Sequence, residues 1–198
     1  YSMRNLLHTY FDRTRVGRLD YFRQLLFLTF VPLSIFLFGL HLVGSYGLTI
    51  KPALACSVCY ILVASVALIA YLFQSPKKLK LIMHVCFVLL MVIQSVRLLV
   101  LAFIGQYDPM LTTVNITVCY IIVLVGSISH LPRTSLVCTC INLTTIFLCR
   151  YLTNNPMYGQ LLIIYGFMSV VTTVFGFVAD KLLREQQMEL KDYANTIG

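Results

Sequence analysis

Acidic side chains and catalytic motifs are what this chain most clearly lacks. Only seven of its 198 residues are Asp or Glu, and none lies in the interior of a long apolar run. Proton-coupled pumps and intramembrane aspartyl proteases depend on such carboxylates. The sequence also has no H-E-x-x-H, G-x-S-x-G, G-x-G-x-x-G or Walker A motif, and no inverted repeat of the kind many transporters carry. We therefore expect that this chain is not itself an enzyme or an ion pump.

Charge of either sign is scarce. Charged residues make up 11% of the chain and hydrophobic residues 59%, with a mean hydropathy of +0.87. An average soluble protein has about 25% charged residues. The composition therefore predicts an integral membrane protein with little room for a soluble domain.

Six apolar runs are each close to the roughly 20 residues that a membrane-spanning helix needs. They cover about 21–44, 52–73, 79–105, 110–129, 134–152 and 158–180. Short segments rich in Gly, Pro, Asn and Asp separate them, as expected for turns. The sequence predicts an all-α polytopic bundle of six transmembrane helices across residues 21–180.

The basic residues predict the orientation, because Lys and Arg near span ends stay cytoplasmic. If both termini are inside, only Lys51 and Arg150 lie outside, and Arg97 lies within a span. The inner set is Arg4, Arg13, Arg15, Arg18, Arg23, Lys77, Lys78, Lys80, Arg133, Lys181, Arg184 and Lys191. This asymmetry predicts that both termini are cytoplasmic. It also places the net charge of +8 beside anionic membrane lipid rather than nucleic acid.

The first 20 residues combine arginines with apolar side chains such as Leu6, Tyr10 and Phe11. This pattern favours an amphipathic helix in the cytoplasmic interface over residues 1–20. An ordinary basic flank that fixes the first span is the alternative. We expect no signal peptide, because the first apolar run is too long.

Arg97 is the clearest candidate for a functional residue, because an ionisable side chain inside a span is costly. It could face a site in the bundle, or extend along the membrane to the outer interface. Other polar side chains fall at similar depth. Together they predict a ligand-binding set open to the outer side: Arg97, Gln94, Asn115, Tyr60, His41, Arg150, Gln160 and Tyr165. The ligand would be small or lipophilic, and an anion would suit the arginines.

Structural roles are the alternative for each of these residues, since polar side chains also join helices by hydrogen bonds. We expect that role for His84 and Asn142. The seven cysteines include the pair Cys56 and Cys59 in C-x-x-C form. All seven lie in apolar runs, where cysteine behaves as a small hydrophobic residue, so we expect no metal site and no cofactor.

The C-terminal stretch, from Tyr158 to Ile197, contains no proline and can form one helix of about 40 residues. Its last part, residues 181–198, shows a heptad pattern typical of a coiled coil. The predicted seam of this signalling helix is Leu183, Gln186, Leu190, Tyr193 and Ile197. Parallel pairing would make a homodimer, whereas a solvated tail is the alternative.

This layout, ending in LREQQMELKDYANTIG, resembles the six-span N-terminal modules of bacterial membrane receptors. These include sensor histidine kinases of the quorum-receptor kind, six-span class III adenylyl cyclases and membrane-bound helix-turn-helix regulators. The resemblance lies in organisation and transfers no site residue. It implies a sensor module of the bacterial inner membrane that passes a signal through the sixth helix to a cytoplasmic output domain after Gly198. A membrane anchor or assembly subunit is the second hypothesis. A small transporter or lipid-handling protein, with Arg97 and Arg150 as a substrate clamp, is the third.

Overall fold

The computed structural model describes residues 18–43, 51–73, 78–104 and 109–198. Six α-helices account for nearly all of them. Their bounds are α2 Arg18–Val43, α3 Lys51–Phe73, α4 Leu79–Ile104, α5 Pro109–Ile128, α6 Pro132–Thr153 and α7 Pro156–Ile197. Each helix coincides with one of the predicted apolar runs, so the all-α bundle is confirmed for the described residues.

Two helix ends differ by more than two residues from the ends of the predicted apolar runs. Helix α2 begins at Arg18, before the predicted start at residue 21, so residues 18–20 belong to the first helix of the bundle. The predicted interfacial segment otherwise lies outside the described residues. At the other end, α7 continues for 42 residues, so the sixth apolar run and the charged stretch after it form the single helix that the absence of proline predicted.

Proline sets the first turn of three helices. Pro109, Pro132 and Pro156 each occupy the start of their helix, where a missing N–H costs nothing and the fixed φ suits the helix. The α6–α7 turn shows both halves of this chemistry. Asn154 takes a left-handed φ of 50° at the end of α6, and the Asn155 side chain accepts a hydrogen bond from the Met157 N–H at 3.0 Å.

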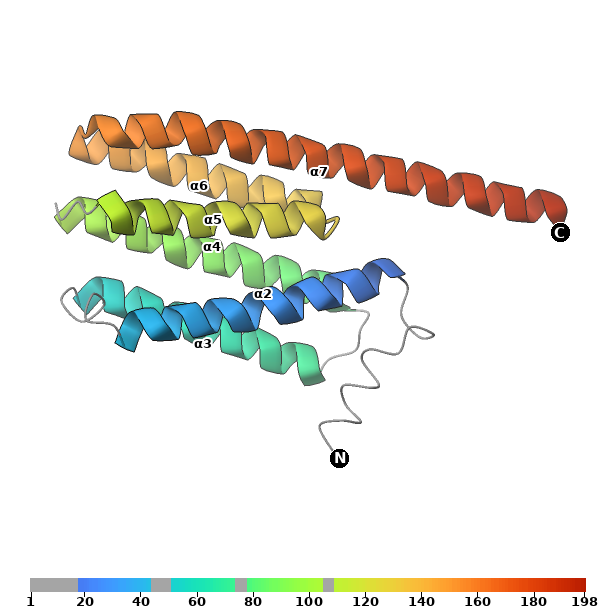
Figure 1. The fold of residues 1–198 in the computed structure, drawn as a ribbon, viewed down its shortest axis with the longest axis horizontal. Helices are drawn as coiled ribbons and strands as arrows, with labels where there is room; N and C mark the ends of the chain where they lie inside the picture. Colours follow the sequence, from blue (N-terminus) through green and yellow to red (C-terminus); the bar gives the residue numbers. More distant parts are fainter. Residues whose placement is uncertain (1–17, 44–50, 74–77, 105–108) are drawn as a thin grey trace.

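The helices run up and down, with α4 packed against α2, α3, α5 and α6. Figure 1 shows that α7 leaves the bundle at one end, together with the starts of α2, α4 and α6. We call this the exit end. The opposite end, where α2 and α4 finish and α5 and α7 begin, is the far end. Helix α7 packs on α5 and α6 and then extends alone (Figure 1).

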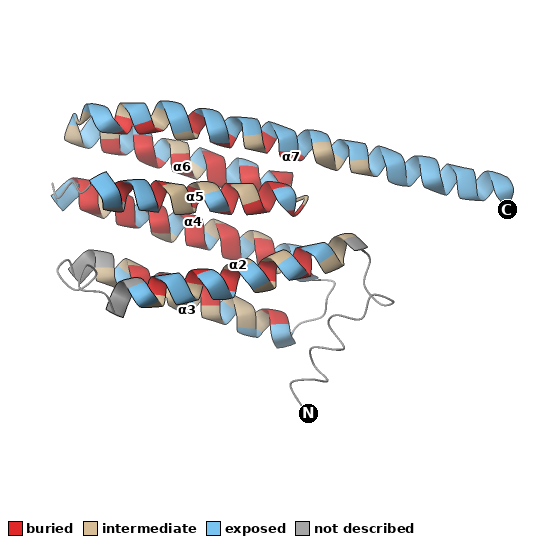
Figure 2. Cartoon of the chain, in the orientation of Figure 1, coloured by how far each residue is buried: buried red, intermediate tan, exposed pale blue. Residues whose placement is uncertain are grey.

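The outer surface of the bundle is apolar. Five helices are long and apolar enough to cross a membrane, namely α2, α3, α4, α6 and α7, whereas the apolar part of α5, Thr112–Ile128, is shorter. Large side chains such as Phe103 and Phe167 are 81% and 72% exposed, and the exposed faces run along each helix (Figure 2). Because soluble monomers rarely expose such continuous apolar surface, the chain is an all-α bundle of the membrane type.

Candidate functional site

Arg97 is held inside the bundle. The residue is 3% exposed, and its guanidinium carbon lies 5.8 Å from the centre of the Phe38 ring. On the Phe38 ring also stacks the fully buried ring of Tyr60, with the two centroids 4.1 Å apart. A cation over an aromatic face gains electrostatic energy that grows when water is excluded. Helices α2, α3 and α4 therefore enclose the Arg97 side chain within the bundle.

A cavity of about 370 Å³ lies beside Arg97, between α2, α4 and α5. Arg97 and Asn115 bring its charged and amide groups, and Ser34 adds a hydroxyl that donates to the Val31 carbonyl at 2.8 Å. The rest of the wall is apolar: Phe30, Leu33, Leu37, Phe38, Val114, Val118 and Ile121. Its volume is at the lower end of the range for small-molecule sites, roughly 300–1,000 Å³.

The structure brings together part of the predicted ligand-binding set. Arg97 and Asn115 line the cavity, Tyr60 supports its wall through Phe38, and Gln94 is buried one turn before Arg97 on α4. These four residues come from three helices, α3, α4 and α5, and are brought together by the packing of the bundle.

The remaining members of that set lie elsewhere. Arg150 is beside Gly159, at the α6–α7 contact near the far end, and Gln160 is exposed. The Tyr165 hydroxyl bonds the Thr117 hydroxyl at 2.9 Å, between α7 and α5. Among the described residues, therefore, none of these three lines the Arg97 cavity. His41 lies in the last turn of α2, but its side chain is outside the described part of the chain.

Sequence reasoning missed the contribution of α2. Phe30, Ser34 and Phe38 line the cavity at spacings of four residues, which place side chains on one helix face. Without knowledge of the neighbouring helices, this apolar row has the same appearance as a lipid-facing one. The four-residue spacing is the one signal that the sequence offered.

A row of hydroxyl groups joins α5 to α7. Besides the Thr117–Tyr165 bond, the Tyr120 hydroxyl bonds the Thr172 hydroxyl at 3.0 Å, and Ser127 Oγ donates to the Thr172 carbonyl at 3.1 Å. The cavity residues of α5, such as Asn115 and Val118, lie on a different face. Helix α5 therefore touches the cavity on one side and α7 on the other.

Hydrogen bonds between side chains also fix α6. His84 Nδ1 lies 2.7 Å from Thr134 Oγ1, between α4 and α6, so the expected structural role of His84 is confirmed. Thr139 bonds Thr173 of α7 at 3.0 Å. Asn142 is buried, but its side-chain nitrogen and oxygen have no hydrogen-bond partner among the described residues. The same expectation was therefore wrong for Asn142.

Unsatisfied polar atoms also occur beside the cavity. The Asn115 side-chain nitrogen and both polar atoms of the Gln94 side chain are buried without a hydrogen-bond partner in the described part of the chain. A buried donor without an acceptor costs about 1–3 kcal/mol, and an apolar residue of similar shape removes this cost. The site therefore carries donors that contribute nothing to stability in this state.

We expect Asn115→Leu to raise the free energy of unfolding by about 1 kcal/mol, because it removes an unpaired amide from an apolar wall. Equilibrium unfolding in mixed detergent micelles measures this change. Thr139→Val is the matched control, since it breaks the Thr139–Thr173 bond at almost constant volume and should lower stability by about 0.6 kcal/mol. A loss of stability for Asn115→Leu would show that the amide is paired in the folded protein.

The cysteines behave as apolar residues. All seven are free, and Cys86, Cys119, Cys138 and Cys149 are buried. Within the residues that the structure describes, no group of three or more His, Cys, Asp or Glu side chains is placed to hold a metal ion.

The last part of α7 has no neighbour in the described chain. Leu190, Tyr193 and Ile197 of the predicted seam are 70%, 67% and 71% exposed. Residues at intervals of seven along α7 lie on nearly the same face of the helix. Ile197 and Leu190 belong to one such series, and the same series includes Gly176 and Ser169, which are buried in the bundle. The predicted seam thus continues the face of α7 that packs on α5 and α6.

Comparisons with protein families, with curated proteins and with solved structures find no match.

Proposed function

We propose that this chain is the membrane-embedded input module of a sensor, in which a small or lipophilic ligand binds beside Arg97. The bound ligand changes the position of α7, which acts on a cytoplasmic effector. The observation that carries the proposal is the arrangement of α5 between the Arg97 cavity and the hydroxyl bonds to α7. A ligand that favours one position of α5 shifts α7 with it, provided that its affinity differs between the two states.

The proposed topology has six spans with both termini cytoplasmic. Helix α5 has 20 residues, which gives about 30 Å of helix and matches the hydrocarbon core. The exit end carries most of the described basic residues of the bundle, including Arg23, Lys80 and Arg133. By the positive-inside rule, this end faces the cytoplasm. The free part of α7 then enters the cytoplasm, where two copies of the chain pair along its apolar seam.

The two rival functions have less support from the site. A passive anchor gives no reason for a buried arginine beside a cavity, because such a residue is costly in a membrane. A transporter that clamps its substrate with Arg97 and Arg150 needs both side chains at one site, and Arg150 does not line the cavity. A sensor needs only one ligand site and a connection to α7.

The test is a reporter domain that is active only as a dimer, fused after Gly198 so that the helix continues into it. Inserting one residue after Asp180 turns the distal helix by about 100°, whereas inserting seven turns it by only about 20°. We expect the one-residue insertion to change reporter output several-fold and the seven-residue insertion to preserve it. Arg97→Gln should also change output, whereas Arg150→Gln, outside the cavity, should not.

Equal output from the parent and both insertions would mean that the rotation of α7 carries no signal. Output that also ignores Arg97→Gln would reduce the module to an anchor. In either result, the sensor proposal fails.

A further inference from the structure

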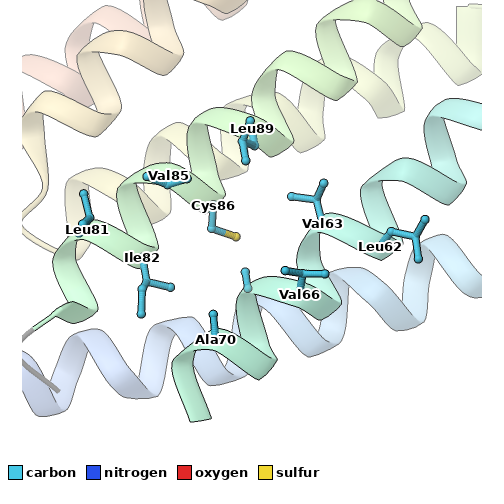
Figure 3. Close-up of a pocket in the computed structure, with 10 residues that line it drawn as sticks. Leu62, Val63, Val66, Ala70, Leu81, Ile82, Val85, Cys86 and Leu89 are labelled. Carbon is cyan, nitrogen blue, oxygen red and sulfur yellow. The ribbon is translucent and has the colours of Figure 1, made fainter. Parts of the chain in front are cut away.

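Two cavities open on the apolar surface of the bundle, and they differ in chemistry. The one between α3 and α4 has a volume of about 440 Å³ and is lined by aliphatic side chains and the Cys86 thiol. Figure 3 shows Val63, Val66, Ile82 and Val85 around it. No charged or amide group lines this cavity, so it can accept a hydrocarbon chain but cannot select a head group. The Arg97 cavity combines an apolar wall with a cation, and so it can select both parts of a ligand.

The Arg97 cavity offers hydrogen-bond donors from Arg97 and Asn115. A guanidinium has five N–H donors and no acceptor, and the Asn115 side-chain nitrogen is a buried donor with no partner among the described residues. Together they suit a group that carries negative charge and several acceptor oxygens, as a carboxylate or a phosphate does. A cationic ligand would be repelled by Arg97, and a hydrocarbon would leave the Asn115 nitrogen without an acceptor.

The cavity opens sideways from the bundle. Leu33 and Leu37 on α2, and Val114 on α5, are 54%, 56% and 50% exposed and line its wall. In a membrane-spanning bundle, surface at this level faces lipid, so a ligand enters from the bilayer. The apolar residues then hold the hydrophobic part of the ligand, and the donors lie deeper.

We infer that the cavity binds a single-chain amphipathic anion, whose carboxylate or phosphate head lies at Arg97 and Asn115 and whose hydrocarbon chain lies between α2 and α5. The volume of about 370 Å³ favours one chain over the two of a membrane phospholipid. This inference rests on the proposed function, because it names the ligand class of the same site.

The absence of tryptophan from the chain makes a direct test possible. Leu37→Trp places a single tryptophan at the cavity wall, in protein reconstituted into phosphatidylcholine nanodiscs. A brominated long-chain fatty acid, in its ionised form, quenches that fluorescence on contact, and its methyl ester is the uncharged control. Because charge-assisted hydrogen bonds add roughly 1.5–3 kcal/mol, we expect the acid to quench at a concentration about tenfold or more below that of the ester.

Three variants make the test specific. Phe36→Trp is the reporter control, because Phe36 is 62% exposed on α2 and does not line the cavity; there the acid and the ester should quench equally. In the Leu37→Trp background, Arg97→Gln should remove the difference between acid and ester. Asn115→Leu should reduce the difference between acid and ester, and this variant gives a result even if Arg97→Gln fails to fold.

A competition experiment distinguishes the two head groups. If a monoacyl phosphate displaces the brominated acid more strongly than the unlabelled acid does, the head group is a phosphate. If it displaces the brominated acid less strongly, the head group is a carboxylate.

Equal quenching by acid and ester at Leu37→Trp would overturn the ligand class. If acid binding is selective but neither the acid nor Arg97→Gln alters the reporter fused after Gly198, the ligand class stands and the sensor function fails. If the acid does not bind selectively and Arg97→Gln still alters the reporter, the function stands and the ligand belongs to another class.

Discussion

Arg23→Met is expected to lower the free energy of unfolding by about 3 kcal/mol, the largest loss among the side chains of the exit end. Arg23 is 2% exposed. Its Nε donates to the Ser129 carbonyl at 2.7 Å and its Nη2 to the His130 carbonyl at 3.1 Å, while Nη1 bonds Asp20 at 3.1 Å. Methionine fills the space but leaves the two carbonyls of the α5–α6 turn without these donors.

Equilibrium unfolding in mixed detergent micelles measures the loss. The matched control is Arg184→Met, because Arg184 pairs with Asp180 at 2.8 Å but its side chain is 72% exposed; such a helix pair contributes about 0.3–0.5 kcal/mol. Arg23→Lys keeps the charge without the fork of donors and should fall between the two. If Arg23→Met costs no more than Arg184→Met, then α2 is not anchored through this contact.

Gly176→Ala is expected to destabilise the α5–α7 contact by about 1–3 kcal/mol, the usual cost of overpacking. A Cβ at this position of α7 would lie 2.9 Å from Ser127 Oγ, 3.1 Å from its Cβ and 3.3 Å from its Cα. Rotating the serine side chain relieves only the first contact. The backbone of α5 or α7 must move, and the Ser127–Thr172 bond is expected to break with it.

Gly39→Ala is the control for helix propensity. It makes the same substitution within α2, where a Cβ would meet nothing within 4 Å, so we expect a gain of up to about 1 kcal/mol. Unfolding measurements on both variants and on the double variant Gly176→Ala, Ser127→Gly complete the test. The double variant should recover part of the loss, because removing the serine side chain makes room. Equal effects of Gly176→Ala and Gly39→Ala would show that α5 and α7 do not pack this closely.

The helices could be predicted from the sequence because the membrane sets their length. A run of about 20 apolar residues has few alternatives to a helix in a bilayer, and the prolines at 109, 132 and 156 mark where three helices begin. The start of α2 was less predictable. Arg18 and Asp20 are polar, so the apolar run does not include them, although Asp20 lies in the first turn of α2 and bonds Arg23.

The site could be predicted only in part. Arg97 and Asn115 stand out because polar residues are costly in apolar runs. Tyr165 stands out for the same reason, yet it bonds Thr117 across a helix contact. Depth in the membrane can be read from a sequence, but the direction of a side chain around the helix axis depends on which neighbours pack on each face. For the same reason, the place of Phe38 in the cavity wall could not be predicted from the sequence.

The seam proposed for pairing two copies of the chain continues the face of α7 that the bundle buries. Gly176 and Ser169 lie against α5 and α6, and Leu190 and Ile197 follow at intervals of seven on the same side. A straight helix drifts by about 20° per heptad, so the seam at Ile197 has turned only about 60° from Gly176. A second α7 that approaches this side meets the first bundle. If two copies pair along this seam, α7 must therefore twist or bend where it leaves the bundle.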